Sequence, residues 1–181
     1  SAPARGPVKG MNARSVPRRM TEIEGDAESR ITMPIGEFAR VLGGGIVPGS
    51  IVLVGGDPGI GKSTLLLQMA LEMASGKADG KVKPRDFRIL YVSGEESERQ
   101  IKMRAMRLSR LGGEKDPGNF SDDLLLLTET NLDVVLEQAQ ALKPDLLIVD
   151  SIQTVYLPDM HSTAGSVSQV RECANRLREL A

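Results

Sequence analysis

One stretch of the sequence combines glycine, lysine and hydroxyl side chains at a spacing that suits phosphate chemistry. Residues 55–64 read GGDPGIGKST, so Gly56, Gly61, Lys62 and Ser63 occupy all the fixed positions of a phosphate-binding loop. Glycines let successive backbone N–H groups turn inward as an anion site, and a helix that begins near the lysine would add its positive end. The pattern predicts a binding site for a nucleoside triphosphate.

The side chains of this loop have separate expected roles. Lys62 would place a positive charge at the β- and γ-phosphates, Ser63 would bind Mg²⁺, and Thr64 would lie near the α-phosphate. The predicted nucleotide site comprises Gly56, Asp57, Pro58, Gly59, Ile60, Gly61, Lys62, Ser63 and Thr64. An ordinary glycine turn is the alternative, but the position between an apolar run and an apolar-faced helix favours a nucleotide site.

Acidic residues follow two other apolar runs and could act on a bound nucleotide. Asp150 ends the run LLIVD, where it could hold Mg²⁺ through water or simply begin a loop. Glu95 and Glu96 follow the run LYVSG, and hydrolysis needs a carboxylate that polarises the attacking water. We expect Glu95 to do this, although both glutamates could merely favour the start of the following helix. The predicted catalytic set is therefore Glu95, Lys62 and Asp150.

Apolar runs alternate with amphipathic segments over most of the chain. The predicted strands cover residues 50–54, 87–93, 123–129 and 145–151. The first predicted helix extends from the phosphate loop to Gly76, and the second covers about 96–111. The third extends from a cap at Asn131 to Pro144, and the fourth begins at a capping box of Ser166 and Gln169. Strands that are apolar throughout and alternate with helices indicate an α/β fold with a mostly parallel sheet and helices on both faces. The last helix has no strand after it, so we expect a fold truncated before its last strands.

The composition is that of an ordinary globular domain. The chain has 181 residues, 40% hydrophobic and 26% charged, which is enough for one sizeable core. The single Cys173 excludes an internal disulfide, and no apolar run reaches the length of a membrane span, so no membrane partner is expected. Residues 1–20 carry five basic residues and no acid in a chain of net charge −1. Such an arm could bind nucleic acid, or it could be a solvated flexible tail.

Four segments together resemble the bacterial RadA/Sms recombination ATPases, which are relatives of RecA. They are LGGGIVPGSIVLVGGDPGIGKSTLLLQMA, LYVSGEES, LLIVDSIQTVY and GSVSQVRECANRL. The resemblance implies a RecA-like P-loop ATPase core over 31–181, incomplete at its carboxyl end, after a basic flexible arm over 1–30. It also implies that ATP and Mg²⁺ are the cofactors, with Glu95 positioning water and Asp150 handling the metal. The zinc ribbon and the carboxyl-terminal part of that family are absent from the sequence.

The same resemblance implies partners and a process. Proteins of this family assemble as hexameric rings, bind single-stranded DNA and promote branch migration of recombination intermediates during repair. We therefore expect a DNA-dependent ATPase module that forms homo-oligomers, with residues 157–166 in a region facing DNA. Basic residues on the helix near 99–110 could face DNA or a neighbouring subunit, or could be solvated surface.

Two other functions stay open, and so does the compartment. A RecA-fold ATPase could act on protein partners or as a replicative-helicase-like core, or the chain could bind nucleotide or DNA without hydrolysis. A bacterial member would be cytoplasmic. The polar insert over 77–86 is longer than expected for a bacterial member and hints at a plant homologue in a plastid or mitochondrion.

Overall fold

Three parallel strands form the sheet of the protein in the computed structural model, which describes residues 17, 19–22, 30–76, 87–113 and 116–181. The strands are β1 (Ile89–Ser93), β2 (Leu124–Thr128) and β3 (Leu146–Asp150), in the spatial order β2-β1-β3. Their register is level, because Ser93 at the end of β1 pairs with both Thr128 and Asp150. The segments that leave the strands therefore begin along one edge of the sheet.

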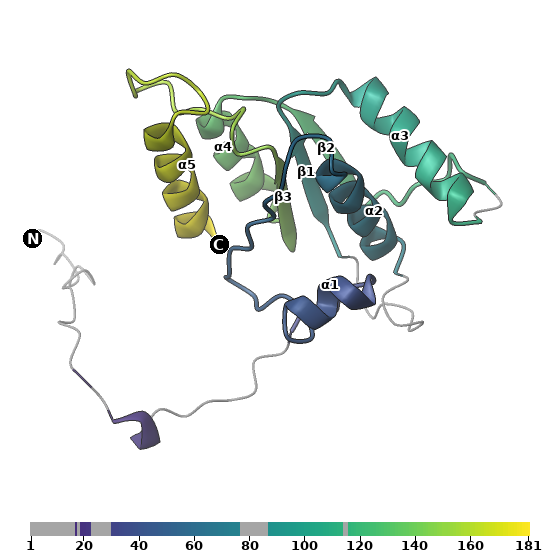
Figure 1. Ribbon diagram of the computed structural model, residues 1–181, viewed down its shortest axis with the longest axis horizontal. Helices are drawn as coiled ribbons and strands as arrows, with labels where there is room; N and C mark the ends of the chain where they lie inside the picture. The colour runs from purple at the N-terminus through teal and green to yellow at the C-terminus, as the bar shows by residue number, and fades with distance from the viewer. Residues whose placement is uncertain (1–16, 18, 23–29, 77–86, 114–115) are drawn as a thin grey trace, which may run out of the picture.

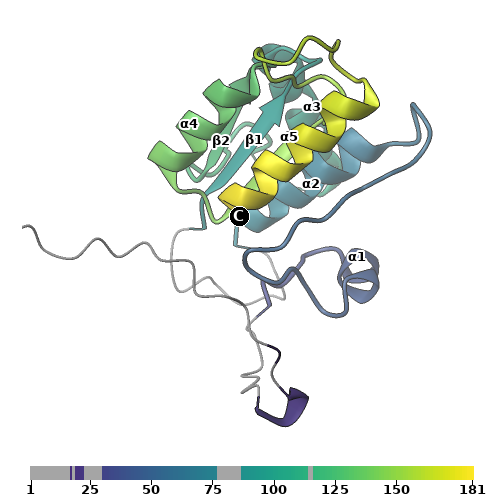
Figure 2. The same cartoon turned by 90° about the vertical axis from the view of Figure 1, so that its left-hand side faces the viewer.

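Helices cover both faces of this sheet. The described helices are η1 (Met20–Glu22), α1 (Gly36–Val41), α2 (Lys62–Ala74), α3 (Glu98–Leu111), α4 (Leu132–Leu142) and α5 (Val167–Leu180). Figures 1 and 2 show α2 and α3 on one face and α4 and α5 on the other. This arrangement confirms the predicted α/β class with a parallel sheet between two helical layers.

The central strand β1 divides its side chains between two hydrophobic cores. Ile89 and Tyr91 pack in the core that contains α2 and α3, whereas Leu90 and Val92 pack in the core that contains α4 and α5. All five residues of β1 are buried, which explains why its sequence is apolar rather than alternating. The predicted strands over 87–93, 123–129 and 145–151 are confirmed, with slightly tighter bounds.

The helix starts follow their sequence signals in part. Asn131 caps α4 as expected, since its side chain accepts a hydrogen bond from the Asp133 backbone N–H. Ser166 likewise accepts from the Gln169 backbone N–H at the start of α5. The second hydrogen bond of the expected capping box, from the Ser166 N–H to the Gln169 side chain, is not formed. The Gln169 side chain instead points inward and is buried. It accepts from the Leu157 N–H at 3.0 Å and donates to the Leu157 and Ser162 carbonyls, satisfying backbone groups of the preceding loop.

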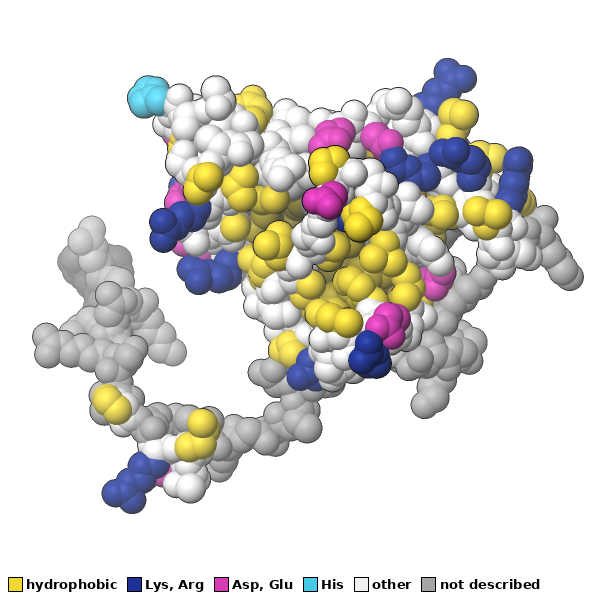
Figure 3. All heavy atoms as spheres, viewed as in Figure 1, with side chains coloured by type: hydrophobic (Ala, Val, Ile, Leu, Met, Phe, Trp, Pro, Cys, Tyr) yellow, Lys and Arg dark blue, Asp and Glu magenta, His cyan; other side chains and the backbone are white. Residues whose placement is uncertain are grey.

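The prediction of a strand over 50–54 is wrong, because these residues form no strand among the described residues. This segment joins no sheet, and Ile51, Val52 and Leu53 are 48%, 38% and 81% exposed. A strand needs a partner for its backbone N–H and C=O groups, and no described strand is paired with this run. Hydrophobic side chains gather in the centre of the face in Figure 3, where this segment passes in front of β3 in Figure 1.

Some predicted segments lie outside the described residues, namely 77–86 and most of 1–30. Within the described ranges, every helix is too short or too polar to pass through a bilayer.

Candidate functional site

The glycine-rich loop lies directly before α2, at the carboxyl-terminal edge of the sheet. Gly59 and Gly61 have φ angles of 79° and 102°, a left-handed conformation that disfavours side chains with a Cβ. Gly61 is the N-cap of α2, so the loop turns straight into the first helical residue, Lys62. The open N-terminus of this helix gives the loop backbone donors and a positive dipole end, as an anion site requires.

Lys62 folds back over the loop that precedes it. Its Nζ donates to the carbonyl oxygens of Gly56 and Asp57 at 2.8 and 2.9 Å. The ammonium group therefore lies within the glycine loop, among the groups predicted to surround the phosphates. Thr64, in the same turn of α2, is exposed to solvent.

Asp150 links the phosphate loop to the sheet. Ser63 Oγ donates to Asp150 Oδ1 at 2.9 Å, across 87 residues of sequence. The hydroxyl of Tyr91 donates to Asp150 Oδ2 at 2.7 Å. Burial, followed by the hydrogen bond to Asp150, raises the pKa of the Tyr91 phenol, so it remains a donor at neutral pH. The two predicted metal ligands, Ser63 and Asp150, are thus in direct contact.

Glu95 and Glu96 have different surroundings although they are adjacent. Glu96 forms an ion pair with Arg104 of α3, and its backbone N–H donates to Ser93 Oγ at 3.2 Å. Glu95 is exposed, and its Oε1 accepts from Ser151 Oγ at 3.2 Å, directly after Asp150. The structure therefore holds Glu96 on the α3 side and leaves Glu95 accessible beside the end of β3.

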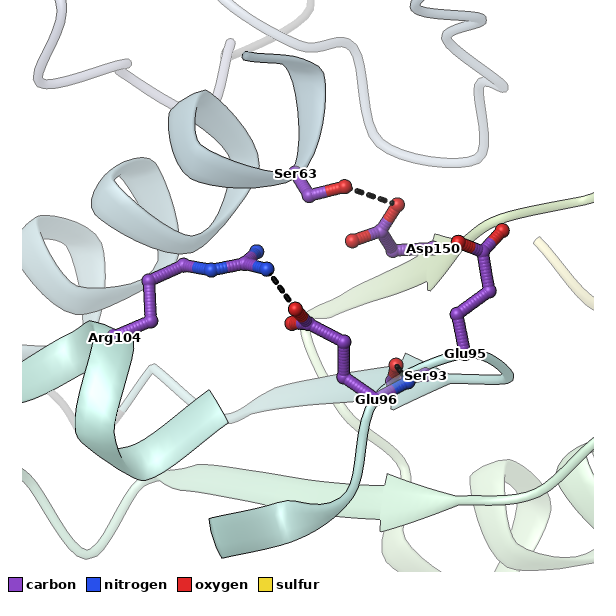
Figure 4. Close-up of a pocket in the computed structure, with 6 residues that line it drawn as sticks. All are labelled: Ser63, Ser93, Glu95, Glu96, Arg104 and Asp150. Atoms are coloured by element: carbon purple, nitrogen blue, oxygen red, sulfur yellow. Dashed lines mark hydrogen bonds and ion pairs between the residues drawn. The ribbon is translucent and has the colours of Figure 1, made fainter. Parts of the chain in front are cut away.

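A small polar cavity collects these groups at one place. Its volume is about 70 Å³, which is room for a few water molecules. It is lined by the residues drawn in Figure 4, namely Ser63, Ser93, Glu95, Glu96, Arg104 and Asp150. They come from α2, β1, the turn after β1, α3 and β3. The sequence prediction that Ser63, Glu95 and Asp150 lie together is borne out by this geometry.

The sequence does not reveal three polar members of the site, namely Ser93, Tyr91 and Arg104. Tyr91 lies inside an apolar strand, where a tyrosine is most simply a core residue. Arg104 is one of the five basic residues on the helix near 99–110, for which the sequence leaves DNA, a neighbouring subunit or solvent open. In the structure, Arg99, Lys102, Arg107 and Arg110 are exposed, and Figure 3 shows basic side chains gathered over α3. Arg104 is the one residue of these five that lines the cavity, and its position in the sequence does not distinguish it from the other four.

The turn that carries Glu95 packs tightly against the segment after β3. The Gly94 N–H donates to the Asp150 carbonyl at 3.2 Å. A Cβ on Gly94 would lie 2.2 Å from Thr154 Oγ1 and 2.7 Å from Thr154 Cβ. A glycine is therefore required here by lack of space, and it brings Glu95 close to the end of β3.

The residues fit a nucleotide with magnesium. The glycine loop offers backbone donors, Lys62 offers a cation, and the oxygens of Ser63 and Asp150 are hard ligands of the type that Mg²⁺ prefers. A glycine loop that enters a helix at the carboxyl edge of a parallel sheet, with a serine–aspartate pair beside it, defines a P-loop nucleotide-binding protein of the α/β class.

Comparisons with known proteins agree with this class. A family profile described as an AAA domain matches residues 17–181. The chain is 48% identical over 170 residues to the DNA repair protein RadA of Synechocystis sp., which covers 89% of this chain. It is 48% identical over 162 residues to RadA of Listeria monocytogenes, a match that covers 90% of this chain. It is 47% identical over 165 residues to RadA of Bacillus subtilis, a match that covers 91% of this chain.

The chain belongs to this AAA domain family, and its resemblance to the ATPase core of the RadA/Sms proteins is confirmed. It spans about a third of the length of each of these three relatives, 32% in every case.

The crowding at Gly94 yields a first prediction. Gly94→Ala should lower the free energy of unfolding by about 1–3 kcal/mol, because the new methyl group forces the Glu95 turn away from Thr154. Urea unfolding followed by circular dichroism measures this change. Gly36→Ala is the matched control, since a Cβ there meets nothing within 4 Å, and it should alter stability by less than about 0.5 kcal/mol. Equal stability of the two variants would contradict the packing described.

Proposed function

We propose that the chain is the ATP-binding and ATP-hydrolysing core of a DNA repair protein. The observation that carries this proposal is the 2.9 Å contact between Ser63 of the phosphate loop and Asp150 of β3, with Glu95 beside them. A phosphate anchor, a metal-binding oxygen pair and a separate carboxylate are the groups that phosphoryl transfer to water requires.

Nucleotide binding is assigned to the loop and the first turn of α2. The backbone N–H groups of the loop and the ammonium of Lys62 would bind the phosphates. Lys62 now donates to the carbonyls of Gly56 and Asp57, and it would exchange these weak partners for charged phosphate oxygens. The residues assigned to ATP remain Gly56, Asp57, Pro58, Gly59, Ile60, Gly61, Lys62, Ser63 and Thr64.

The metal is assigned to Ser63 directly and to Asp150 through water. When bound, Mg²⁺ neutralises charge that develops on the phosphate oxygens. Ser63 Oγ and Asp150 Oδ1 already face each other, so a small separation of these two oxygens would suffice to admit the ion and its water. This arrangement requires no new side-chain direction at either residue.

Glu95 is assigned the role of positioning the attacking water. Its carboxylate is exposed and lies beside Ser151, next to the metal-binding Asp150. Glu96 is a poorer candidate, because its carboxylate is already engaged in an ion pair with the guanidinium of Arg104. The ion pair with Arg104 thus supports the choice of Glu95 over its neighbour.

The role in DNA repair is supported by the relatives, which are DNA repair proteins by name. Since the chain spans only about a third of them, its partners are part of the proposal. They are single-stranded DNA and recombination intermediates undergoing branch migration, acted on by a homo-oligomeric ring. The three relatives compared are bacterial, and a bacterial member of the family would be cytoplasmic, whereas a plant homologue would lie in a plastid or mitochondrion.

Substitution of the two glutamates separates binding from hydrolysis. Glu95→Gln should retain ATP binding and lower the ATP turnover number by at least about 100-fold, the usual loss for a catalytic base. Glu96→Gln is the matched control and should lower turnover by less than about tenfold, because its carboxylate is turned to Arg104.

Lys62→Ala should abolish ATP binding itself. Phosphate release and calorimetric binding distinguish these cases, and an unimpaired Glu95→Gln variant would refute the assignment.

Single-stranded DNA discriminates between the competing functions. We expect an oligonucleotide to raise the steady-state ATPase rate, with less stimulation as salt increases, because phosphate contacts weaken with ionic strength. The rate is measured with and without the oligonucleotide at several salt concentrations. A rate that ignores DNA would favour an ATPase that acts on protein partners.

A further inference from the structure

Tyr91 is a polar residue in a position that packing alone would assign to phenylalanine. Its side chain lies in the core with α2 and α3, and the residue is only 1% exposed. A phenol buried in an apolar core needs a hydrogen-bond partner for its hydroxyl. The partner of Tyr91 is the carboxylate of Asp150, at 2.7 Å, the distance typical of a hydroxyl that donates to an ionised group.

The register of the sheet explains how these two residues meet. Tyr91 pairs with Ile148, two residues before Asp150 on the same face of β3. The Asp150 side chain therefore reaches Tyr91 diagonally across the strands, a contact that long side chains make readily. Asp150 itself lies opposite Ser93, whose Oγ accepts a hydrogen bond from the Glu96 N–H.

A carboxylate with both oxygens engaged cannot rotate freely. Oδ2 of Asp150 is held by Tyr91 on the sheet, so Oδ1 points toward Ser63 on the phosphate loop. Without the phenol, the carboxylate could turn about its last torsion, which is intrinsically broad. One hydroxyl in the core thus restricts the angle at which the Asp150 carboxylate is presented to the loop.

We propose that Tyr91 is a positioning residue that orients Asp150 for the metal–phosphate complex. The inference rests on the proposed function, because it concerns how the same site couples Mg²⁺ to ATP. Tyr91 would not touch the nucleotide or the metal, and it would act only through the carboxylate. Groups that orient metal ligands in this way typically contribute 10- to 100-fold to metal affinity.

Tyr91→Phe tests this role by removing a single oxygen atom from the core. Titration calorimetry with ATP, first in excess EDTA and then at a series of Mg²⁺ concentrations, gives the metal-free affinity and the tightening caused by Mg²⁺. We expect the metal-free affinity to change less than twofold. The Mg²⁺ concentration that gives half of the tightening should rise about tenfold.

Tyr156→Phe is the matched control, because it removes the same oxygen from a tyrosine that lies after β3. Within the described residues, Tyr156 forms hydrogen bonds only through its backbone, to Thr130 and Leu132. Its Mg²⁺ dependence should match that of the unsubstituted protein. A second test adds Tyr91→Phe to Asp150→Asn, where it should cause no additional loss of metal coupling if it acts through Asp150.

Three results would overturn the inference. Tyr91→Phe could leave the Mg²⁺ dependence unchanged, or weaken ATP binding equally in EDTA, or cause a further loss of coupling in the Asp150→Asn background. Each would show that the hydroxyl serves stability or another group instead. Failure of the proposed function is a separate result, in which the unsubstituted protein binds ATP no more tightly with Mg²⁺ than without it.

Discussion

The carboxylate of Asp150 joins the two halves of the site, because its oxygens accept hydrogen bonds from different structural elements. Ser63 belongs to the helix that follows the glycine loop, and Tyr91 belongs to the central strand. Asp150 is partly buried, and such donors replace the water that its carboxylate loses. This one side chain therefore links the start of α2, directly after the phosphate loop, to the central strand of the sheet.

The parallel sheet is what allows these groups to meet. Its three strands end in level register, so Glu95 leaves β1 beside the residues that follow β3. Helices on both faces bury β1 completely and give the strand ends a rigid base. Because Gly94 has no side chain, the turn that carries Glu95 can pack against Thr154, close to Asp150. The separation of Glu95 from Glu96 follows from the same frame, because α3 begins directly after them and carries Arg104 back to Glu96.

The sequence was sufficient for features that depend on local patterns. The phosphate loop, the three paired strands, the cap at Asn131 and the convergence of Ser63, Glu95 and Asp150 all follow from spacing and from the geometry of parallel strands. Features that depend on distant neighbours were not accessible. The run at 50–54 has the composition of a strand, but composition does not supply a pairing partner. Gln169 has the spacing of a capping box, but its side chain instead forms hydrogen bonds with the backbone N–H and C=O of Leu157. Tyr91 resembles any core aromatic residue until its distance to Asp150 is known.

The most direct test of this account is a crystal structure of the protein with Mg²⁺ and a non-hydrolysable ATP analogue. We expect the triphosphate to lie in the loop over residues 56–64 and the metal to separate Ser63 Oγ from Asp150 Oδ1. Asp150 Oδ2 should remain bonded to Tyr91, and Glu95 should face the γ-phosphate. A triphosphate bound elsewhere, or a metal site without Ser63 and Asp150 beside it, would contradict the account.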